Sequence, residues 1–189
     1  MKNVFLFAVL VALAVAIVPQ ATAEQHARER HSVVKAVKVA SPQIGAMLLR
    51  GIAARRDETW RWQKVMLHTR TPFHDSARHV QSVNYRKWVL GLWHRRALAA
   101  RRQAHNPPHK TQWLCIHRYE GSWTDSGSPY YGGLQMDIGF QETYGLTLYR
   151  AKGTADHWTP LEQMWVAERA YRTRGFWPWP NTARYCGLI

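Results

Sequence analysis

The run Asn106-Pro107-Pro108 constrains the fold more than any other feature, because two consecutive prolines cannot lie inside a helix. This run also separates two parts of different charge. Residues 24–112 contain 18 Lys and Arg against 5 Asp and Glu, whereas the residues that follow contain 7 of each kind. We therefore expect a basic N-terminal region over residues 24–110 and a near-neutral domain over residues 111–189.

The first residues have the pattern of a secretory signal peptide. Lys2 precedes an apolar run over residues 4–18, and Ala21-Thr22-Ala23 has the small-x-small form of a cleavage site. The apolar run is too short to span a bilayer comfortably, and no second long apolar run follows it. The sequence thus predicts a signal peptide over residues 1–23 and a secreted or cell-wall protein with no stable membrane span after cleavage.

Export bears on the two cysteines. Cys115 and Cys186 make an even count in an oxidising compartment, which favours a disulfide over free thiols. An alternative is a cysteine peptidase that uses Cys115 with His157. That alternative requires Cys186 to be unpaired.

Two helices are expected in the basic region. Residues 24–40 are polar and lack a clear period, so a flexible start is expected before a helix that Ser41 caps and Pro42 begins. A second helix starts at Ser82, with Arg86 among the basic residues that lie away from its apolar face. That face consists of Tyr85, Trp88, Val89, Leu92 and Trp93.

The charge of this region predicts polyanionic partners. Since the protein is exported, anionic wall polymers such as teichoic acids are expected to bind residues 24–110, and nucleic acid is not. The alternative for the same residues is a solvated linker whose aromatic stripe faces a core.

The C-terminal part has clear helix boundaries. Thr159-Pro160-Leu161-Glu162 is a capping box with proline at the first helical position, and Gly175 ends that helix. Glu168 on this helix is expected beside aromatic side chains. A further helix is predicted from a cap at Asp137 to Tyr144, where Gly145 would stop it.

One carboxylate stands out as a candidate for acid catalysis. The segment that starts at Trp113 predicts a short helix with Glu120 at its C-terminal end. There the helix dipole and the flanking Tyr119 and Trp123 favour the protonated form of the carboxyl group. A glycosidase acid needs this property to protonate the leaving oxygen, although a turn glutamate at the surface is the simpler interpretation of these residues alone.

The motifs around Glu120 resemble a known family. Glu120-Gly121-Ser122-Trp123, the run Tyr130-Tyr131-Gly132-Gly133-Leu134-Gln135-Met136, and the Gly175-Phe176 and Trp179-Pro180 pairs are similar to the resuscitation-promoting factors and related actinobacterial transglycosylase-like domains. The resemblance covers about 75 residues and none of the basic region. It implies a mainly α, lysozyme-like α+β domain, stapled by a Cys115–Cys186 disulfide, with Glu120 as the catalytic residue.

The resemblance also implies a glycan-binding site with no cofactor and no metal. Tyrosine faces would stack on sugar rings, and adjacent glycines would let a sugar approach the backbone. The expected substrate-binding residues are Trp123, Asp125, Tyr130, Tyr131, Gly132, Gly133 and Gln135. Asp125 is either a second carboxylate for the reaction or a turn former. His105 and His109 have zinc-like spacing, but the prolines between them prevent the helix that would bring both to one metal.

These observations predict an enzyme that cleaves the β-1,4 bond between N-acetylmuramic acid and N-acetylglucosamine in peptidoglycan glycan strands. The sequence leaves open whether it is a muramidase or a lytic transglycosylase. The alternative of a different class is a non-catalytic wall-binding module that keeps the aromatic groove and uses the basic region as an anchoring arm.

Overall fold

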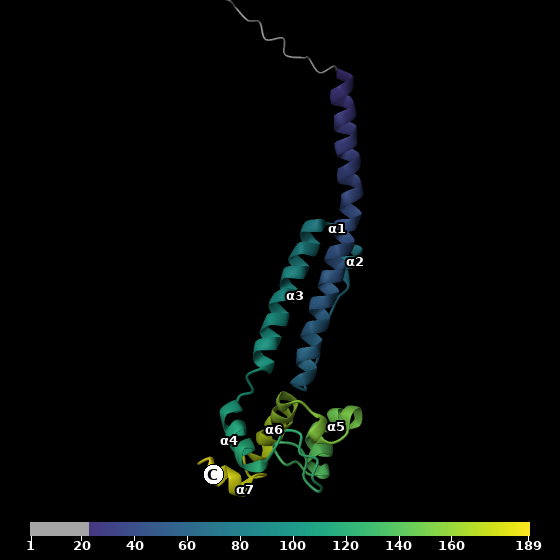
Figure 1. Cartoon of the computed structure of the whole chain (residues 1–189). Coiled ribbons are helices and arrows are strands. Elements are labelled where there is room, and N and C mark those ends of the chain that lie inside the picture. The colour runs from purple at the N-terminus through teal and green to yellow at the C-terminus, as the bar shows by residue number, and fades with distance from the viewer. Residues whose placement is uncertain (1–22) are drawn as a thin grey trace, which may run out of the picture. The chain divides into compact units, whose positions relative to one another are not determined.

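The computed structural model describes residues 23–189, and the signal peptide expected over residues 1–23 lies outside them apart from its last residue. The described chain is mainly helical (Figure 1). Its extended pairing is limited, within these residues, to an isolated antiparallel bridge between Tyr131 and Met136. None of the described helices combines the length and the apolar character that crossing a membrane requires.

Helix α1 (Ala23–Val65) begins much earlier than the sequence suggests. The expectation of a flexible start before a cap at Ser41 is wrong, because the helix passes through Pro42. Eleven of residues 23–40 are Ala, Glu, Gln, Arg or Lys, whose high helix propensity supports helix on that side of the proline. The chain divides into two compact units between Pro42 and Gln43, and the second unit contains every element described below.

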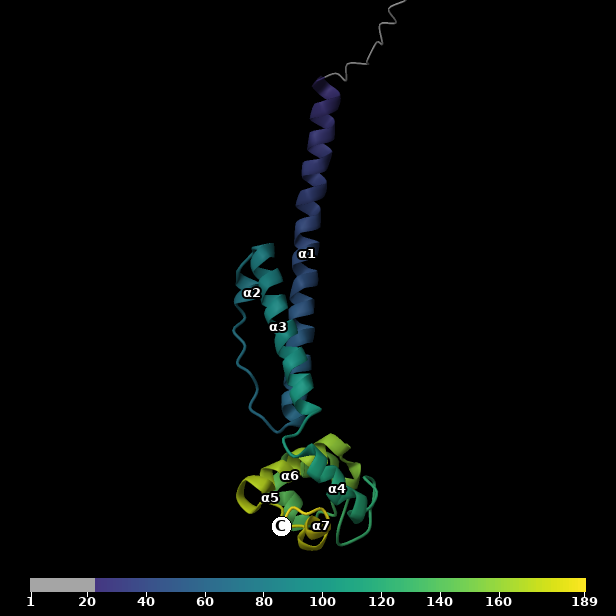
Figure 2. The same ribbon diagram turned by 90° about the vertical axis from the view of Figure 1, so that its left-hand side faces the viewer.

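Helix α3 (Val83–Ala104) lies beside the part of α1 that follows Pro42, and the connecting segment carries the short helix α2 (Ser76–His79) along them (Figures 1 and 2). The expected start of this helix at Ser82 is confirmed, and the Ser82 side chain caps it by accepting a hydrogen bond from the Tyr85 backbone N–H. Two of the five predicted face residues, Val89 and Trp93, are buried against Ile52 of α1.

The position of Arg86 differs from the expectation. Its side chain is buried, and Nε donates a 2.9 Å hydrogen bond to the Ala77 carbonyl in α2. Trp88, expected on the apolar face, is 59% exposed instead. The reason is that the partner surface includes backbone acceptors of the connecting segment, which the periodicity of one helix does not reveal. The helix thus presents Trp88 to solvent together with the basic side chains Lys87, Arg95, Arg101 and Arg102.

The C-terminal part consists of four α-helices and one 3₁₀ turn around an aromatic core. The elements are α4 (Lys110–Glu120), α5 (Ile138–Lys152), η1 (Ala155–His157), α6 (Pro160–Arg174) and α7 (Pro180–Tyr185). Trp113, Trp158 and Trp179 are almost completely buried in this core. Trp113 and Trp179 meet edge to face with ring centroids 5.1 Å apart, an arrangement that stabilises aromatic pairs.

Helix boundaries in this part follow the sequence with one exception. The Thr159 capping box, the start at Pro160 and the end at Gly175 are confirmed, as is the Asp137 cap of α5. Gly145, however, kinks α5 and does not end it. A Cβ atom at this position would lie 2.6 Å from the Trp158 ring, so the glycine makes room for that ring while the helix continues to Lys152.

The C-terminal ends of α1 and α3 pack directly on α6. Trp165 is 3% exposed, and its indole N–H donates a 2.9 Å hydrogen bond to the carbonyl of Ala104 at the end of α3. Met66 joins the same buried cluster. His68 contacts the Trp165 ring edge to face, and burial together with the nearby Arg172 charge lowers the pKa of His68. Helices α1 and α3 therefore share a buried contact with α6.

The predicted disulfide is confirmed and links the start of the C-terminal fold to its end. Cys115 on α4 and Cys186 after α7 are bonded across a sequence separation of 71 residues. Closing a loop of that length stabilises the folded state by roughly 4 kcal/mol in the chain-entropy model.

We expect the double variant Cys115→Ser, Cys186→Ser to lose about 4 kcal/mol of unfolding free energy, because its unfolded chain regains the loop entropy. Urea denaturation of the oxidised parent and the variant measures the difference. The reduced parent is the control and should match the variant. A difference below about 1 kcal/mol would contradict the expectation.

Candidate active site

Glu120 is the last residue of α4, and its placement follows from the buried face of that helix. Trp113 and Ile116 are completely buried, which fixes the rotation of α4 and leaves Glu120 partly exposed. Gly121 then ends the helix with φ of 148°, a backbone conformation that favours glycine. The prediction that a short helix ends at Glu120 is confirmed.

A hydrogen bond holds the Glu120 carboxylate in place. The Thr182 hydroxyl, on α7, donates to Glu120 Oε1 over 2.7 Å. Thr182 is itself buried, and the Cys115–Cys186 bridge joins α4 to the chain directly after α7. Sequence reasoning missed Thr182, because 62 residues separate it from Glu120 and no local motif marks it.

Asp125 and Gln135 form a second polar pair near the end of α4. Gln135 Nε2 donates to Asp125 Oδ2 over 2.8 Å and to the Gly132 carbonyl over 3.0 Å. A Cβ atom on Gly121 would lie 3.3 Å from Asp125 Oδ2, so the pair lies beside the residue that follows Glu120. Asp125 Oδ1 also accepts the Gly127 backbone N–H, as in an Asx turn. Asp125 thus forms the turn and also carries a carboxylate at the site.

The Tyr-Tyr-Gly-Gly-Leu-Gln run forms a tight turn closed by paired backbone hydrogen bonds. Tyr131 and Met136 exchange two of them, and Gly132 N–H donates to the Asp125 carbonyl over 2.7 Å. Gln135 has φ of 47°, an unusual conformation for a residue with a side chain, and one that often occurs where function needs it. Tyr130 is 50% exposed beside this turn, and Tyr131 is half-buried.

The two glycines of the run are buried, and protein atoms fill the space beside them. A Cβ atom on Gly132 would lie 2.6 Å from the Gln163 side chain, and one on Gly133 would lie 2.6 Å from His117. Trp123 stacks on the His117 ring with centroids 3.9 Å apart. Close packing within the protein therefore requires glycine here, a reason that sequence reasoning did not provide. Their role in sugar binding stays a prediction.

Gln163 is the residue that ties these segments together. Its Oε1 accepts the Gly133 backbone N–H over 2.8 Å. Its Nε2 lies within hydrogen-bond distance of three carbonyls, those of Trp123, Ala155 and Trp158. The side chain is completely buried on α6. It therefore fixes the glycine turn and the segment after Glu120 against one helix.

Glu168 is a buried carboxylate whose oxygens are occupied. Oε1 accepts hydrogen bonds from the Trp113 indole N–H over 2.8 Å and from the His109 backbone N–H over 2.7 Å. His109 Nδ1 lies 3.0 Å from Oε2. The predicted aromatic surroundings of Glu168 are confirmed. Its three contacts hold the first turn of α4 on α6, so Glu168 supports the helix that carries Glu120.

The disulfide bears on catalysis by a cysteine peptidase, and the distribution of ligand side chains bears on metal binding. Both cysteines of the chain are bonded, so a cysteine peptidase would lack its thiolate nucleophile. Among residues 23–189, no three His, Cys, Asp or Glu side chains come together in a metal-binding arrangement.

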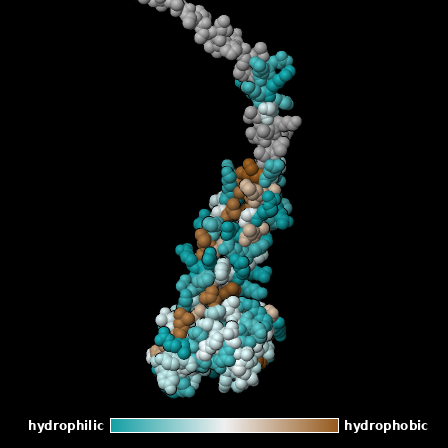
Figure 3. Space-filling model, in the orientation of Figure 1, coloured by the Kyte–Doolittle hydropathy of each residue, from teal (hydrophilic) through white to brown (hydrophobic). Residues whose placement is uncertain are grey.

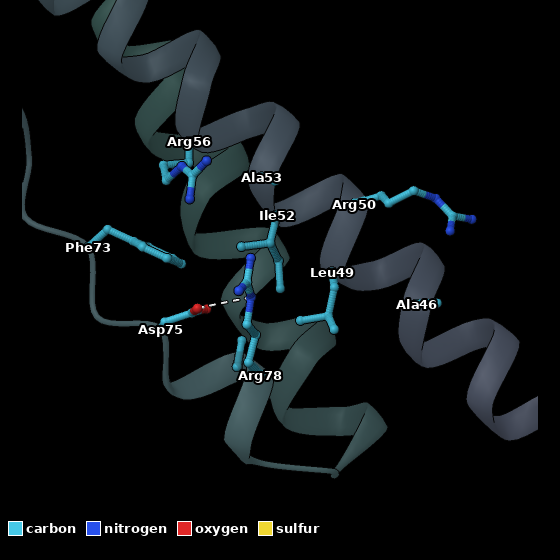
Figure 4. A pocket seen from close by; sticks show the side chains of 10 residues that line it. Ala46, Leu49, Arg50, Ile52, Ala53, Arg56, Phe73, Asp75 and Arg78 are labelled. Atoms are coloured by element: carbon cyan, nitrogen blue, oxygen red, sulfur yellow. Dashed lines mark ion pairs between the residues drawn. The ribbon is translucent and has the colours of Figure 1, made fainter.

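The basic region contains a separate cavity of about 340 Å3 between α1 and the segment before α3 (Figure 4). Leu49, Ile52 and Phe73 line its apolar part. Two arginines at its edge have partners, since Arg78 pairs with Asp75 over 2.9 Å and Arg56 lies over the Phe73 ring. The cavity thus lies where the connecting segment packs against α1, and both of these arginines have partners within the protein.

Comparison of the chain with protein-family models, with curated proteins and with solved structures gives no match.

We expect Gln163→Leu to lower the unfolding free energy by about 3 kcal/mol or more, because one buried N–H and up to three carbonyls lose their partner. Thermal and urea denaturation measure the loss. Gln141→Leu is the matched control, since Gln141 is equally buried but makes one such bond, to the Met136 carbonyl. Equal losses in both variants would refute the role given to Gln163.

Proposed function

We propose that this protein is a secreted enzyme that cleaves the glycan strands of peptidoglycan, with residues 111–189 as a lysozyme-like α+β domain. The observation that carries the proposal is the setting of Glu120. It is a partly exposed carboxylate at a helix end, held by Thr182 and next to the Asp125–Gln135 pair. The proposed substrate, peptidoglycan, comes from the resemblance of the surrounding motifs to peptidoglycan-cleaving domains.

Glu120 acts as the general acid in this proposal. Thr182 binds Oε1, and no donor among the described residues binds Oε2, which leaves that oxygen for proton transfer. Protonated Glu120 gives its proton to the glycosidic oxygen between N-acetylmuramic acid and N-acetylglucosamine while the C–O bond breaks. As a base it then deprotonates either water, which gives a reducing end, or the C6 hydroxyl of the muramyl sugar, which gives an anhydro end.

The neighbouring residues bind and orient the strand. Tyr130 offers an exposed ring for stacking, and Tyr131 is half-buried at the base of the turn. Trp123 and Gln135 border the same segment, and Gly132 and Gly133 contribute their backbone. Asp125 holds Gln135 and adds negative charge close to the carbon that becomes positive in the transition state.

We expect Glu120→Gln to reduce cleavage of purified sacculi by roughly 100- to 10,000-fold, because Gln keeps the shape of Glu but supplies no proton. Mass spectrometry of the released sugar ends measures turnover and shows whether they are reducing or anhydro. Glu142→Gln, an equivalent change at an exposed position of α5, is the control and should leave turnover unchanged.

Turnover of Glu120→Gln within about threefold of the parent, at unchanged thermal stability, would exclude Glu120 as the acid. A parent protein that binds sacculi and releases no sugar ends would instead support the wall-binding module. A larger loss in Asp125→Asn than in Glu120→Gln would make Asp125 the principal carboxylate.

We propose further that the basic region binds anionic wall polymers. No Asp or Glu occurs between Asp75 and Glu120, and α3 therefore has no acidic residue. The exposed cations of α3 are Lys87, Arg95, Arg101 and Arg102, and no ion pair within residues 23–189 involves them. Figure 3 shows that the visible surface of the helical region is mostly hydrophilic, with apolar patches in between. Such unpaired charge attracts phosphate-rich polymers over a Debye length.

The triple variant Arg95→Gln, Arg101→Gln, Arg102→Gln should lose most of its binding to walls that carry teichoic acid at low salt, because three unpaired charges disappear. The control has Arg150, Arg169 and Arg174 replaced by Gln, which removes the same charge from exposed positions of the C-terminal helices. Sedimentation with walls at increasing salt measures binding. If both variants lose wall binding equally, binding depends on net charge alone and α3 has no special role.

A further inference from the structure

Two exposed aromatic rings lie together next to Glu120, outside the motif that suggests the glycan site. Tyr119 is 54% exposed and Tyr185 is 73% exposed, and their ring centroids lie 5.7 Å apart. Tyr119 directly precedes Glu120 on α4. Tyr185 ends α7, three residues after Thr182, which binds the Glu120 carboxylate. The two rings and the carboxylate thus belong to the same contact between α4 and α7.

Two links hold this contact on either side of the rings. The Cys115–Cys186 bridge involves the residue one turn before Tyr119 and the residue directly after Tyr185. The Thr182–Glu120 hydrogen bond lies one residue beyond Tyr119 and one turn before Tyr185. Because the backbone at both tyrosines is fixed, little conformational entropy is lost when a ligand binds to the rings.

The exposure of this pair contrasts with the other aromatic residues nearby. Trp113 and Trp179 are buried in the core, where aromatic burial contributes strongly to the stability of so small a domain. Tyr119 and Tyr185 instead leave most of their ring surface in water while they contact each other. Adjacent exposed rings are a typical surface for stacking on the C–H faces of sugars.

We propose that Tyr119 and Tyr185 form a platform for one N-acetylhexosamine ring of the glycan strand, in addition to the residues of the Tyr130–Gln135 turn. This inference rests on the proposed function for the identity of the polymer. The platform lies on the α4–α7 side of Glu120, whereas the Asp125–Gln135 pair follows the end of α4. A strand that crosses Glu120 contacts both, so the platform gives the enzyme a preference for longer glycans.

The test measures binding separately from cleavage. Each tyrosine variant is made in the full chain that carries Glu120→Gln, and the probes are β-1,4-linked N-acetylglucosamine oligomers of three and six sugars. We expect Tyr119→Ala and Tyr185→Ala each to raise the Kd for the six-sugar oligomer by roughly three- to tenfold, and the three-sugar Kd by less. Tyr119→Phe and Tyr185→Phe keep the ring and should bind as the parent does.

Trp177→Ala is the matched control. Trp177 is 62% exposed on the segment between α6 and α7, and no ring contact among the described residues involves it. Its loss should leave both Kd values unchanged. An equal effect of Trp177→Ala and the tyrosine variants would overturn the platform. Tyr185→Ala carries the test if Tyr119→Ala lowers the thermal stability, because the Tyr185 side chain is the more exposed of the two.

The outcomes separate this inference from the proposed function. If the parent cleaves sacculi through Glu120 while both tyrosine variants keep the parent's preference for six sugars over three, the platform is refuted and the enzyme remains. If the parent releases no sugar ends while the tyrosine variants weaken oligomer binding, the reaction is refuted and the platform remains as a glycan-binding surface.

Discussion

The hydrogen bonds of the Gln163 side chain organise the surroundings of the candidate site. A buried amide is costly unless its donors and acceptor are paired, and here backbone groups of three separate segments pair with it. The same contact explains why position 132 requires glycine, since any side chain there would collide with the amide, whereas a side chain at Gly133 would collide with His117 and Trp123. The turn that carries Gln135 is therefore set by α6 and not by its own residues alone.

The position of Glu120 depends on tertiary contacts at both ends of α4. At its start, Glu168 binds His109 and Trp113 and so attaches the first turn to α6. At its end, Thr182 and the disulfide attach the last turns to α7. An eleven-residue helix is too short to be stable alone in water, so these tertiary contacts define both its existence and its direction. A carboxylate at the end of a helix held in this way has a defined position, which the proposed proton transfer would require.

The sequence predicts local features of this fold well and long-range features poorly. The caps at Asp137 and Thr159 are readable, because the hydrogen bond that defines each one joins residues three apart. The contact of Gly145 with the Trp158 ring is not, because thirteen residues separate the two. The burial of Arg86 depends likewise on the carbonyl of Ala77, which a helical periodicity cannot include.

The same limit applies to the candidate site. Glu120 at a helix end and the disulfide could be predicted from motif and cysteine count. Thr182, Gln163 and His117 could not, since each acts on a partner at least 16 residues away without a signature of its own. The start of α1 fails for another reason: a proline at position 42 is the expected first residue of a helix, and only the helix propensity of the preceding residues argues against that.

The distribution of aromatic side chains reflects two competing demands on a region of about eighty residues. So small a core needs most of its large rings inside, and Trp113, Trp158 and Trp179 satisfy that need together with the disulfide. The proposed binding of a sugar polymer would need rings outside, on backbone that does not move. Rings fixed on short helices beside the bridge meet the second demand without loosening the first, because the residues that anchor their backbone, Cys186 and Thr182, already belong to the packed structure. The chain thus uses the same contact between α4 and α7 to stabilise the fold and to hold Glu120, Tyr119 and Tyr185 on fixed backbone.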